Sequence, residues 1–317
     1  MNSLQSTNTV LMIRPCNFGF NSLTAIDNTY QNEHKNGLTD LEIAMRAKFE
    51  FDELVSVLKK NGVCVVEFYD LGIDSTPDSL FPNNWISTHA NGIVYLYPMF
   101  SPNRRLERRK DIVDYLNKNF HIQQVFDDAE IHEDNNIFLE GTGSIVLDRE
   151  NKIAYASISK RTDEGLFIQW CEQMNFRAIY FHAEDSQKPI YHTNVLMSIC
   201  QHFVIICMDA VVSDFKKAEL RTAFSDTNKQ IIDITIKQMN SFLGNVLELR
   251  GQENESLLVM SSAAFCQLTD SQKAIINTHT KIIHASLDTI EYFGGGSARC
   301  MIAELFLNPN INKDLIK

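Results

Sequence analysis

A cysteine near the C-terminal end of the chain stands in a context that suits a nucleophile. Cys300 follows three glycines and an arginine in the segment GGGSARCM, residues 294–301. Glycines let backbone N–H groups approach a substrate closely, and Arg299 could favour the thiolate of a group whose ordinary pKa is about 8.5. Because many free cysteines are only small buried hydrophobic residues, this segment alone leaves a structural interpretation open.

Such a nucleophile suits the cleavage of a C–N bond at a carbon that is a poor electrophile, from which an amine is a poor leaving group. Covalent catalysis divides this barrier, since a thiolate attacks the carbon while a histidine protonates the departing nitrogen and then activates water. A carboxylate on the other ring nitrogen holds the histidine in its productive orientation.

Four further segments could supply these partners: FPNNW (81–85), FLEGTG (138–143), SKRT (159–162) and YHTN (191–194). With the cysteine segment, their order resembles the guanidino-group-modifying (pentein) superfamily of arginine deiminases, dimethylarginine hydrolases and amidinotransferases, which reads FxxD, LEGxx, RT, HxD and GGG...RCM. Each motif alone is weak, but five in one order are specific. The motif sequences most resemble those of the citrulline-utilisation hydrolases, in which PNNW, LEGTG and HTN also occur.

The resemblance implies a catalytic set of Cys300, His192 and Glu140. Without their motifs, His192 would read as an ordinary surface or core histidine and Glu140 as a strand-end carboxylate. Glu140 ends an apolar run, however, and a buried carboxylate persists only with a partner. Arg161 matches the family arginine that binds the substrate α-carboxylate, a task that suits a guanidinium fork, although it could also be an ordinary loop arginine.

Two asparagines depart from the family pattern. Arginine-processing members hold the guanidinium between the aspartates of FxxD and HxD, whereas this chain has Asn84 and Asn194 there. A buried guanidinium without counter-charge is strongly disfavoured, while an asparagine amide offers both a donor and an acceptor to a neutral ureido group. The pattern therefore favours a ureido amino acid as the substrate, with citrulline the first candidate.

The resulting prediction is a cysteine-dependent hydrolase that converts citrulline into ornithine, carbon dioxide and ammonia through an S-carbamoyl intermediate on Cys300. Asn84, Asn194 and Arg161 are its predicted substrate-binding residues. The alternatives on the same fold are an amidinotransferase, an arginine deiminase or a dimethylarginine hydrolase. An alternative of another class is a non-catalytic ligand-binding module, which would have no need of a nucleophile.

Composition narrows the classes of partner. A net charge of -11 over 317 residues argues against a nucleic-acid surface, and the one dense basic run, residues 104–110, reads as an exposed helix face. The sequence shows no signal peptide, no membrane span and no zinc-binding pattern. Seven cysteines without a CxxC pair indicate reduced thiols. We expect a cytoplasmic protein with a small amino-acid substrate, no cofactor and no membrane partner; a homo-oligomer remains open.

Apolar runs separated by turns and amphipathic stretches predict one α/β domain over residues 1–317. The resemblance implies a five-bladed α/β propeller of ββαβ units around a central active site, and five units of about sixty residues would fit the length. Without a GxGxxG after the first strand, a dinucleotide-binding fold has little support. Strands are expected at 9–13, 63–68, 91–97, 144–147, 153–157, 177–181, 203–207 and 257–260, and helices at 41–60, 229–239 and 271–277.

Overall fold

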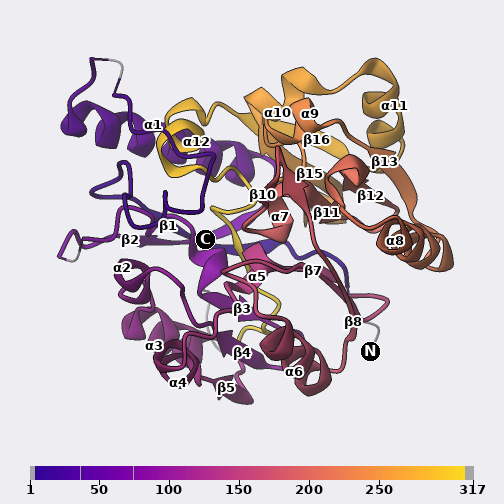
Figure 1. The fold of residues 1–317 in the computed structure, drawn as a ribbon. Helices are drawn as coiled ribbons and strands as arrows, with labels where there is room; N and C mark the ends of the chain where they lie inside the picture. The colour runs from indigo at the N-terminus through magenta and orange to yellow at the C-terminus, as the bar shows by residue number, and fades with distance from the viewer. Residues whose placement is uncertain (1–3, 36, 74, 311–317) are drawn as a thin grey trace.

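The structure, a computed structural model, describes residues 4–35, 37–73 and 75–310. Within these residues, the strands form five three-stranded sheets and a two-stranded ribbon of β9 (Glu184–Asp185) and β10 (Lys188–Pro189). Figure 1 shows the longer helices at the periphery and most strands closer to the middle. The α/β class predicted from the sequence is confirmed.

Each three-stranded sheet repeats one topology. Its first two strands pair antiparallel, one or two helices follow the second strand, and the third strand then pairs parallel with the second. A parallel pair needs such a crossover, because a tight turn joins only antiparallel strands. Every three-stranded sheet in the described residues is therefore a ββαβ unit.

Four of these units follow one another along the chain. The first contains β3 (Ile86–Thr88), β4 (Ile93–Leu96), α2 (Pro102–Arg105), α3 (Lys110–Asn119) and β5 (Gln124–Phe126). The second, which follows α4 (Ala129–Asp134) and α5 (Gly141–Ser144), contains β6 (Ile145–Asp148), β7 (Ile153–Ser157), α6 (Glu164–Met174) and β8 (Arg177–Phe181). The third, after α7 (Thr193–Leu196), contains β11 (Met197–Ile199), β12 (Phe203–Ile206), α8 (Asp214–Asp226) and β13 (Gln230–Asp233). The fourth, after α9 (Ile236–Met239), contains β14 (Leu247–Arg250), β15 (Ser256–Ser261), α10 (Ser262–Gln267), α11 (Asp270–His279) and β16 (Lys281–Ala285).

The fifth unit joins the two ends of the described chain. After α12 (Asp288–Gly294), β17 (Ala303–Glu304) pairs antiparallel with β1 (Thr9–Arg14), and β1 pairs parallel with β2 (Cys64–Tyr69) across α1 (Asp40–Lys60). The Leu305 N–H also donates to the Thr9 carbonyl at 2.9 Å. The C-terminal strand thus closes the structure onto the N-terminal one.

Local sequence explains why these elements form. At the start of α1, the Thr39 hydroxyl accepts from the Glu42 N–H and the Glu42 carboxylate accepts from the Thr39 N–H, a capping box that satisfies two free N–H groups. Phe51, Leu54 and Leu58 then repeat at helical spacing and are fully buried. Strand β12 is buried along its whole length between two neighbouring strands, which matches its unbroken apolar sequence.

The first strands of the units lie next to one another. β6 contacts β11, β11 contacts β14, and β17 contacts β3, while four apolar clusters fill the space between sheets and helices. These contacts favour the five-bladed propeller expected from the resemblance, which stays a prediction. The division into one domain over residues 1–317 also stays a prediction.

One predicted helix is wrong. Residues 229–239 were expected to form a single helix, but they contain strand β13 followed by the one-turn helix α9. Ile231 and Ile232 pair in parallel with Val204 and Ile205 of β12, and such β-branched residues suit a strand that packs on a sheet. Asn228, with φ of 54°, ends the preceding helix in the left-handed region. The other predicted strands and helices are present with small shifts at their ends.

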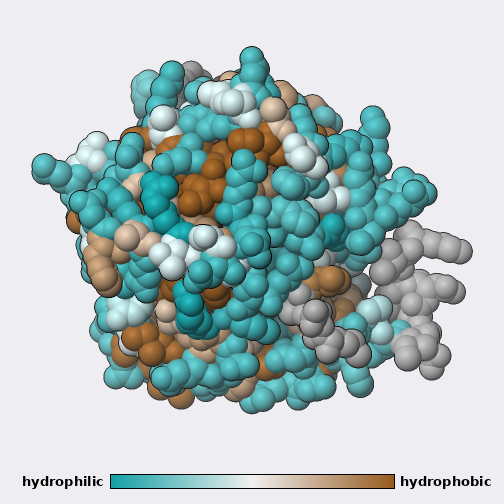
Figure 2. Space-filling view, turned by 90° about the vertical axis from the view of Figure 1, so that its right-hand side faces the viewer, coloured by the Kyte–Doolittle hydropathy of each residue, from teal (hydrophilic) through white to brown (hydrophobic). Residues whose placement is uncertain are grey.

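The outer surface is mixed in character. Figure 2 shows a face on which hydrophilic residues predominate, with apolar residues visible between them. Among the described residues, no helix has the length and apolar character needed to cross a membrane.

Candidate active site

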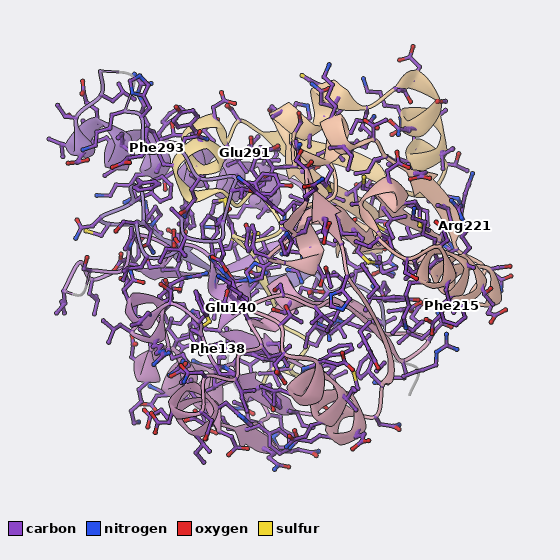
Figure 3. The ribbon with its side chains drawn as sticks, in the orientation of Figure 1. Phe138, Glu140, Phe215, Arg221, Glu291 and Phe293 are labelled. Carbon is purple, nitrogen blue, oxygen red and sulfur yellow. The ribbon has the colours of Figure 1, made fainter. Side chains whose placement is uncertain are left out.

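The candidate site is built from the short turns that come just before the first strand of each unit. These turns carry Asn84 before β3, Glu140 before β6, His192 before β11, Asn245 before β14 and Cys300 before β17. Because the first strands lie side by side, the turns converge although they are far apart in sequence. Figure 3 shows Glu140 near the middle of the molecule.

One small cavity brings most of the predicted residues together. Cys300, His192, Asn84 and Arg161 all line it. The other two predicted residues touch this set, because Glu140 hydrogen-bonds His192 and Asn194 hydrogen-bonds Cys300. Most of the side chains that line the cavity carry polar groups.

His192 and Glu140 form a buried pair. His192 Nε2 lies 2.8 Å from Glu140 Oε2, and both side chains are almost completely buried. Burial alone would raise the pKa of Glu140, but the charge of Arg161 and the hydrogen bond from His192 outweigh it, so the pKa is lowered and the carboxylate is ionised. Burial lowers the pKa of His192, although Glu140 opposes this shift.

The pairing also determines which ring nitrogen of His192 can exchange a proton with a substrate. An ionised Glu140 only accepts hydrogen bonds, so Nε2 carries the proton and Nδ1 is the free acceptor of the neutral ring. Nδ1 lies beside Gly143, where an added Cβ would come within 2.8 Å of it. Any larger residue at position 143 would therefore collide with the ring of His192.

The sulfur of Cys300 is held by two amides. Asn245 Nδ2 donates to Sγ at 3.2 Å and Asn194 Nδ2 donates at 3.5 Å. The expectation that Arg299 would favour the thiolate is wrong, because its guanidinium donates to the Ile302 carbonyl and to Glu304 Oε2, each at 2.9 Å. Arg299 and Cys300 are neighbours in the turn at residues 298–301, but their side chains have different hydrogen-bond partners.

Three asparagine side chains of the site each have one amide atom without a hydrogen-bond partner among the described residues. Asn84 Oδ1 accepts from Arg104 at 2.9 Å, while its buried Nδ2 has no partner among the described residues. Asn194 Oδ1 and Asn245 Oδ1 are likewise buried and unpaired within the described part of the chain. This part of the site therefore combines a free amide donor with two free amide acceptors.

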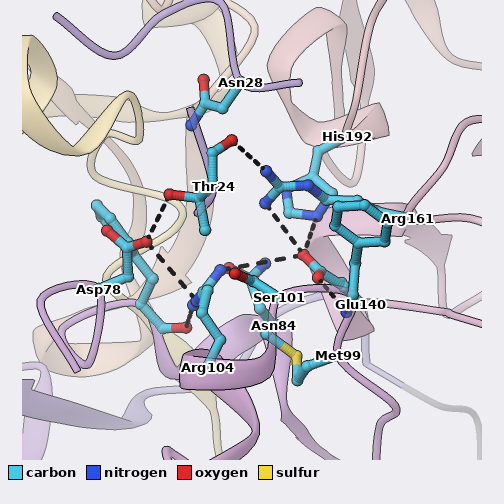
Figure 4. A network of polar contacts seen from close by, with 12 residues as sticks. Thr24, Asn28, Asp78, Asn84, Met99, Ser101, Arg104, Glu140, Arg161 and His192 are labelled. Atoms are coloured by element: carbon cyan, nitrogen blue, oxygen red, sulfur yellow. Dashed lines mark hydrogen bonds and ion pairs between the residues drawn. The ribbon is translucent and has the colours of Figure 1, made fainter. Parts of the chain in front are cut away.

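Arg161 is buried and already paired (Figure 4). Its guanidinium donates to both carboxylate oxygens of Asp27 and, at 2.9 Å, to the Thr24 carbonyl. It lies 3.5 Å from Glu140 Oε2 and packs over the ring of Tyr191. The segment before α1, which carries Asp27 and Thr24, therefore covers this end of the cavity.

A second buried arginine was not predicted. Arg104 donates to both carboxylate oxygens of Glu107 at 2.9 Å and contacts Asn84. The interpretation of residues 104–110 as an exposed helix face is wrong at this position, because only 3% of Arg104 is exposed. Burial raises the pKa of Glu107 to about 7, although the charge of Arg104 acts in the opposite direction.

Asp78 is a further unpredicted residue of the cavity. One of its oxygens accepts from Asn21 at 2.7 Å and from the Thr24 hydroxyl at 3.1 Å, and the other has no partner in the described residues. Burial raises its pKa, while the charge of Arg104 at 4.0 Å lowers it. Thr24 joins Asp78 to Arg161, so the two ionic groups belong to the same end of the cavity (Figure 4).

Comparison with known proteins gives one family match. The family profile described as N,N dimethylarginine dimethylhydrolase, eukaryotic, matches residues 14–307. The chain belongs to this dimethylarginine dimethylhydrolase family. The predicted pentein superfamily and the predicted enzyme class, a hydrolase of C–N bonds other than peptide bonds, are thereby confirmed. No curated protein sequence gives a significant match.

Solved structures with the fold of this dimethylarginine dimethylhydrolase family member include three informative cases. The N-terminal domain of ArgZ, a cyanobacterial arginine dihydrolase, is 14% identical over 93% of this chain and 97% of its own, with a TM-score of 0.71. AgrE bound to L-arginine is 15% identical over 97% of this chain and 41% of its own, with a TM-score of 0.72. A dimethylarginine dimethylaminohydrolase carrying S-methyl-L-thiocitrulline is 13% identical over 94% and 99%, with a TM-score of 0.62. At such low sequence identities, the TM-scores show a similar fold.

Proposed function

We propose that this protein hydrolyses the ureido group of citrulline to ornithine, carbon dioxide and ammonia. The observation that carries the proposal is the set of neutral amides around the nucleophile, since Asn194 and Asn245 contact Cys300 Sγ and Asn84 lines the same cavity. Their unpaired donor and acceptors match the carbonyl and N–H groups of a urea. A guanidinium cation would lack an adjacent counter-charge there.

The charges at the other end of the cavity support an amino-acid substrate. Arg161 and Arg104 place buried guanidinium groups in the cavity wall, where a substrate α-carboxylate would share them with Asp27 and Glu107. The unpaired oxygen of Asp78 offers an acceptor for an α-ammonium group. A zwitterionic head group at this end would place a neutral ureido tail beside Cys300.

The reaction proceeds through a covalent intermediate. Cys300 transfers its thiol proton to His192 Nδ1, and the thiolate forms a C–S bond to the ureido carbon. The C–N bond to the ornithine side chain then breaks, and its nitrogen takes the proton from His192, which leaves an S-carbamoyl group. Water gives a proton to His192 and attacks this group, the C–S bond breaks with return of that proton to sulfur, and the released carbamate decomposes to carbon dioxide and ammonia.

Hydrolysis of arginine or a methylated arginine is the second candidate. The family match supports it, and so does the buried carboxylate of Asp78 in the same cavity. However, Asp78 and Arg161 both hydrogen-bond Thr24. Asp78 therefore belongs to the end of the cavity that would bind the α-amino and α-carboxylate groups of the substrate, away from the reacting carbon.

A product assay tests the proposal. Purified protein is incubated with L-citrulline, L-arginine, asymmetric dimethylarginine and agmatine, and ornithine, citrulline and ammonia are quantified. We expect ornithine and ammonia from citrulline, loss of this activity in Cys300→Ser, and full activity in the matched control Cys266→Ser, since Cys266 is exposed. Accumulation of citrulline from either arginine substrate, with no ornithine from citrulline, would refute the proposal.

A further inference from the structure

A second cavity lies among the first strands of four units. It is small and is lined by residues of β6, β11, β14 and β17. Asn194 lines this cavity and also donates to Cys300 Sγ, so the cavity lies directly beyond the site described above. Arg299 faces this second cavity, whereas its neighbour Cys300 faces the first.

Two buried arginines line the second cavity and share one carboxylate. Arg299 Nη2 lies 2.9 Å from Glu304 Oε2, and Arg149 Nη2 lies 3.5 Å from the same atom. Only 4% of Arg149 and 7% of Arg299 is exposed. Two guanidinium groups therefore depend on a single counter-charge.

The other acid of the cavity is engaged elsewhere. Glu248 accepts hydrogen bonds from the Gln201 N–H and the Ser256 hydroxyl, each at 2.6 Å, and lies 3.9 Å from Arg250. The ring of His89 beside Arg149 adds no charge, because burial lowers its pKa well below the ordinary value. Arg250, which does not line the cavity, thus offsets Glu248, and Arg149 and Arg299 share Glu304.

Arg149 is the group with unused hydrogen-bonding capacity. Among the described residues, its guanidinium makes one hydrogen bond, to His89 Nδ1 at 3.5 Å, besides the ion pair with Glu304. Its flat face packs on the ring of Phe306 at 4.0 Å, which leaves the edge with its N–H donors free. Burial and the nearby charge of Arg299 lower the pKa of Arg149, so Glu304 does not fully compensate it.

A buried hydroxyl points to the same conclusion. The Ser198 side chain on β11 is 95% buried and lines the cavity. Its Oγ has no hydrogen-bond partner among the described residues. Buried polar groups are normally paired, so a ligand with oxygen acceptors would satisfy both Ser198 and Arg149.

We propose that this cavity binds a small monovalent oxyanion, of the carboxylate or bicarbonate class, between Arg149, Arg299 and Ser198. Two coplanar oxygens match the N–H fork of a guanidinium. The carboxylate of Glu304, which lies beside both arginines, disfavours a doubly charged anion such as hydrogen phosphate. The proposal does not depend on which substrate Cys300 attacks.

Calorimetric titration of the whole chain tests this site. Sodium acetate, sodium bicarbonate and sodium phosphate are titrated separately at constant ionic strength, with sodium chloride as the reference. We expect saturable binding of acetate and bicarbonate, and weaker binding of phosphate. Absence of saturable binding of either monovalent anion would overturn the proposal.

Variants locate the bound anion. Arg149→Gln should weaken binding about tenfold or more, because a charged hydrogen-bonding partner is lost. The exposed Arg177→Gln serves as a matched control, and Ser198→Ala, a smaller change that should leave the fold intact, should weaken binding severalfold. Arg161→Gln should bind the anion as the unmodified protein does. Binding that is lost in Arg161→Gln but kept in Arg149→Gln and Ser198→Ala would place the anion in the Cys300 cavity and overturn the assignment.

Discussion

Two amide side chains from different units meet at the sulfur of Cys300. Asn194 precedes β11 and Asn245 precedes β14, and both donate to Sγ. Hydrogen bonds to a charged group stabilise it by about 1.5–3 kcal/mol each. At the scale of single residues, we therefore propose that these two neutral amides stabilise the nucleophilic form of Cys300.

Substitution of Asn245 tests this role. Asn245→Ala removes the shorter of the two hydrogen bonds, so alkylation of Cys300 by iodoacetamide at neutral pH should slow by about tenfold. Peptide mass spectrometry separates Cys300 from the exposed Cys266, whose rate should not change and serves as the internal control. An unchanged rate at Cys300 would show that Asn245 does not stabilise the thiolate.

Gly143 offers a second test at this scale. A Cβ at Gly143 would lie 2.4 Å from Asn84 Nδ2 and 2.8 Å from His192 Nδ1, so Gly143→Ala must displace one of them. A displacement of about 1 Å can lower kcat about 100-fold. Gly165→Ala, in the first turn of α6, is the matched control. The atom nearest to an added Cβ there is Asp163 Oδ1, at 3.3 Å. The activity of this variant should be unchanged. Equal activities of the two variants would contradict the described geometry.

The six predicted site residues belong to the sequence motifs of the superfamily, and the structure brings all of them together. Asn245, Asp78 and Arg104 have no such signal. Asn245 follows a glycine in the plain segment FLGN, and only the position before β14 relates it to the other site turns. Arg104 lies in a basic run whose composition does not reveal which side chain turns inward. The catalytic roles themselves stay predictions.

At the scale of elements, α12 connects the core to the cysteine segment. Glu50 accepts from the Thr289 and Ile290 N–H groups at its start, and Glu291 within it accepts from the Ser297 hydroxyl at 2.6 Å. Burial raises the pKa of Glu291 to about 7, although hydrogen bonds from Ser261 and Ser297 oppose the shift. Glu291 thus holds Ser297, which lies three residues before Cys300.

The raised pKa of Glu291 predicts a pH-dependent stability. The folded state keeps the proton at a pH where the unfolded chain has lost it, so this stabilising contribution is full below the unfolded pKa and is lost as the pH rises to about 7. Glu291→Gln removes the titration. Its Tm relative to the unmodified protein should therefore increase from about pH 5 to about pH 8. The exposed Glu253→Gln is the control, and a Tm difference that is constant with pH would contradict this prediction.

Long periodic elements were predictable, whereas short ones were not. Helix α1 and strands β1 and β12 have clear apolar patterns. β3, β5 and β17 contain only two or three residues, too few to show a period. In β13, the Ile231-Ile232 pair alone does not distinguish strand from helix, and pairing with β12 decides the outcome.

At the scale of the whole molecule, the pairing of β17 with β1 links the ends of the chain. It also fixes Cys300, which lies three residues before β17. Loss of this strand pair should therefore reduce both stability and activity. The same link explains how Cys300, from the last part of the described chain, meets residues from the middle of the chain.

A proline in the closing segment tests this link. Leu305→Pro removes the hydrogen bond from the Leu305 N–H to the Thr9 carbonyl and should lower the free energy of unfolding by about 3 kcal/mol. Leu305→Val keeps the donor and most of the apolar volume, so it should cost about 1 kcal/mol. Denaturant unfolding measures both values, and equal losses would show that the backbone bond contributes little.

The ratio of kcat/KM for citrulline to kcat/KM for arginine tests most directly whether Cys300 attacks a neutral ureido carbon. It is measured in the unmodified protein and in Asn194→Asp, which places a carboxylate beside Cys300 Sγ. We expect the ratio to exceed one in the unmodified protein and to fall by about tenfold or more in Asn194→Asp, because a carboxylate stabilises a bound cation. A preference of the unmodified protein for arginine would contradict the neutral amide site.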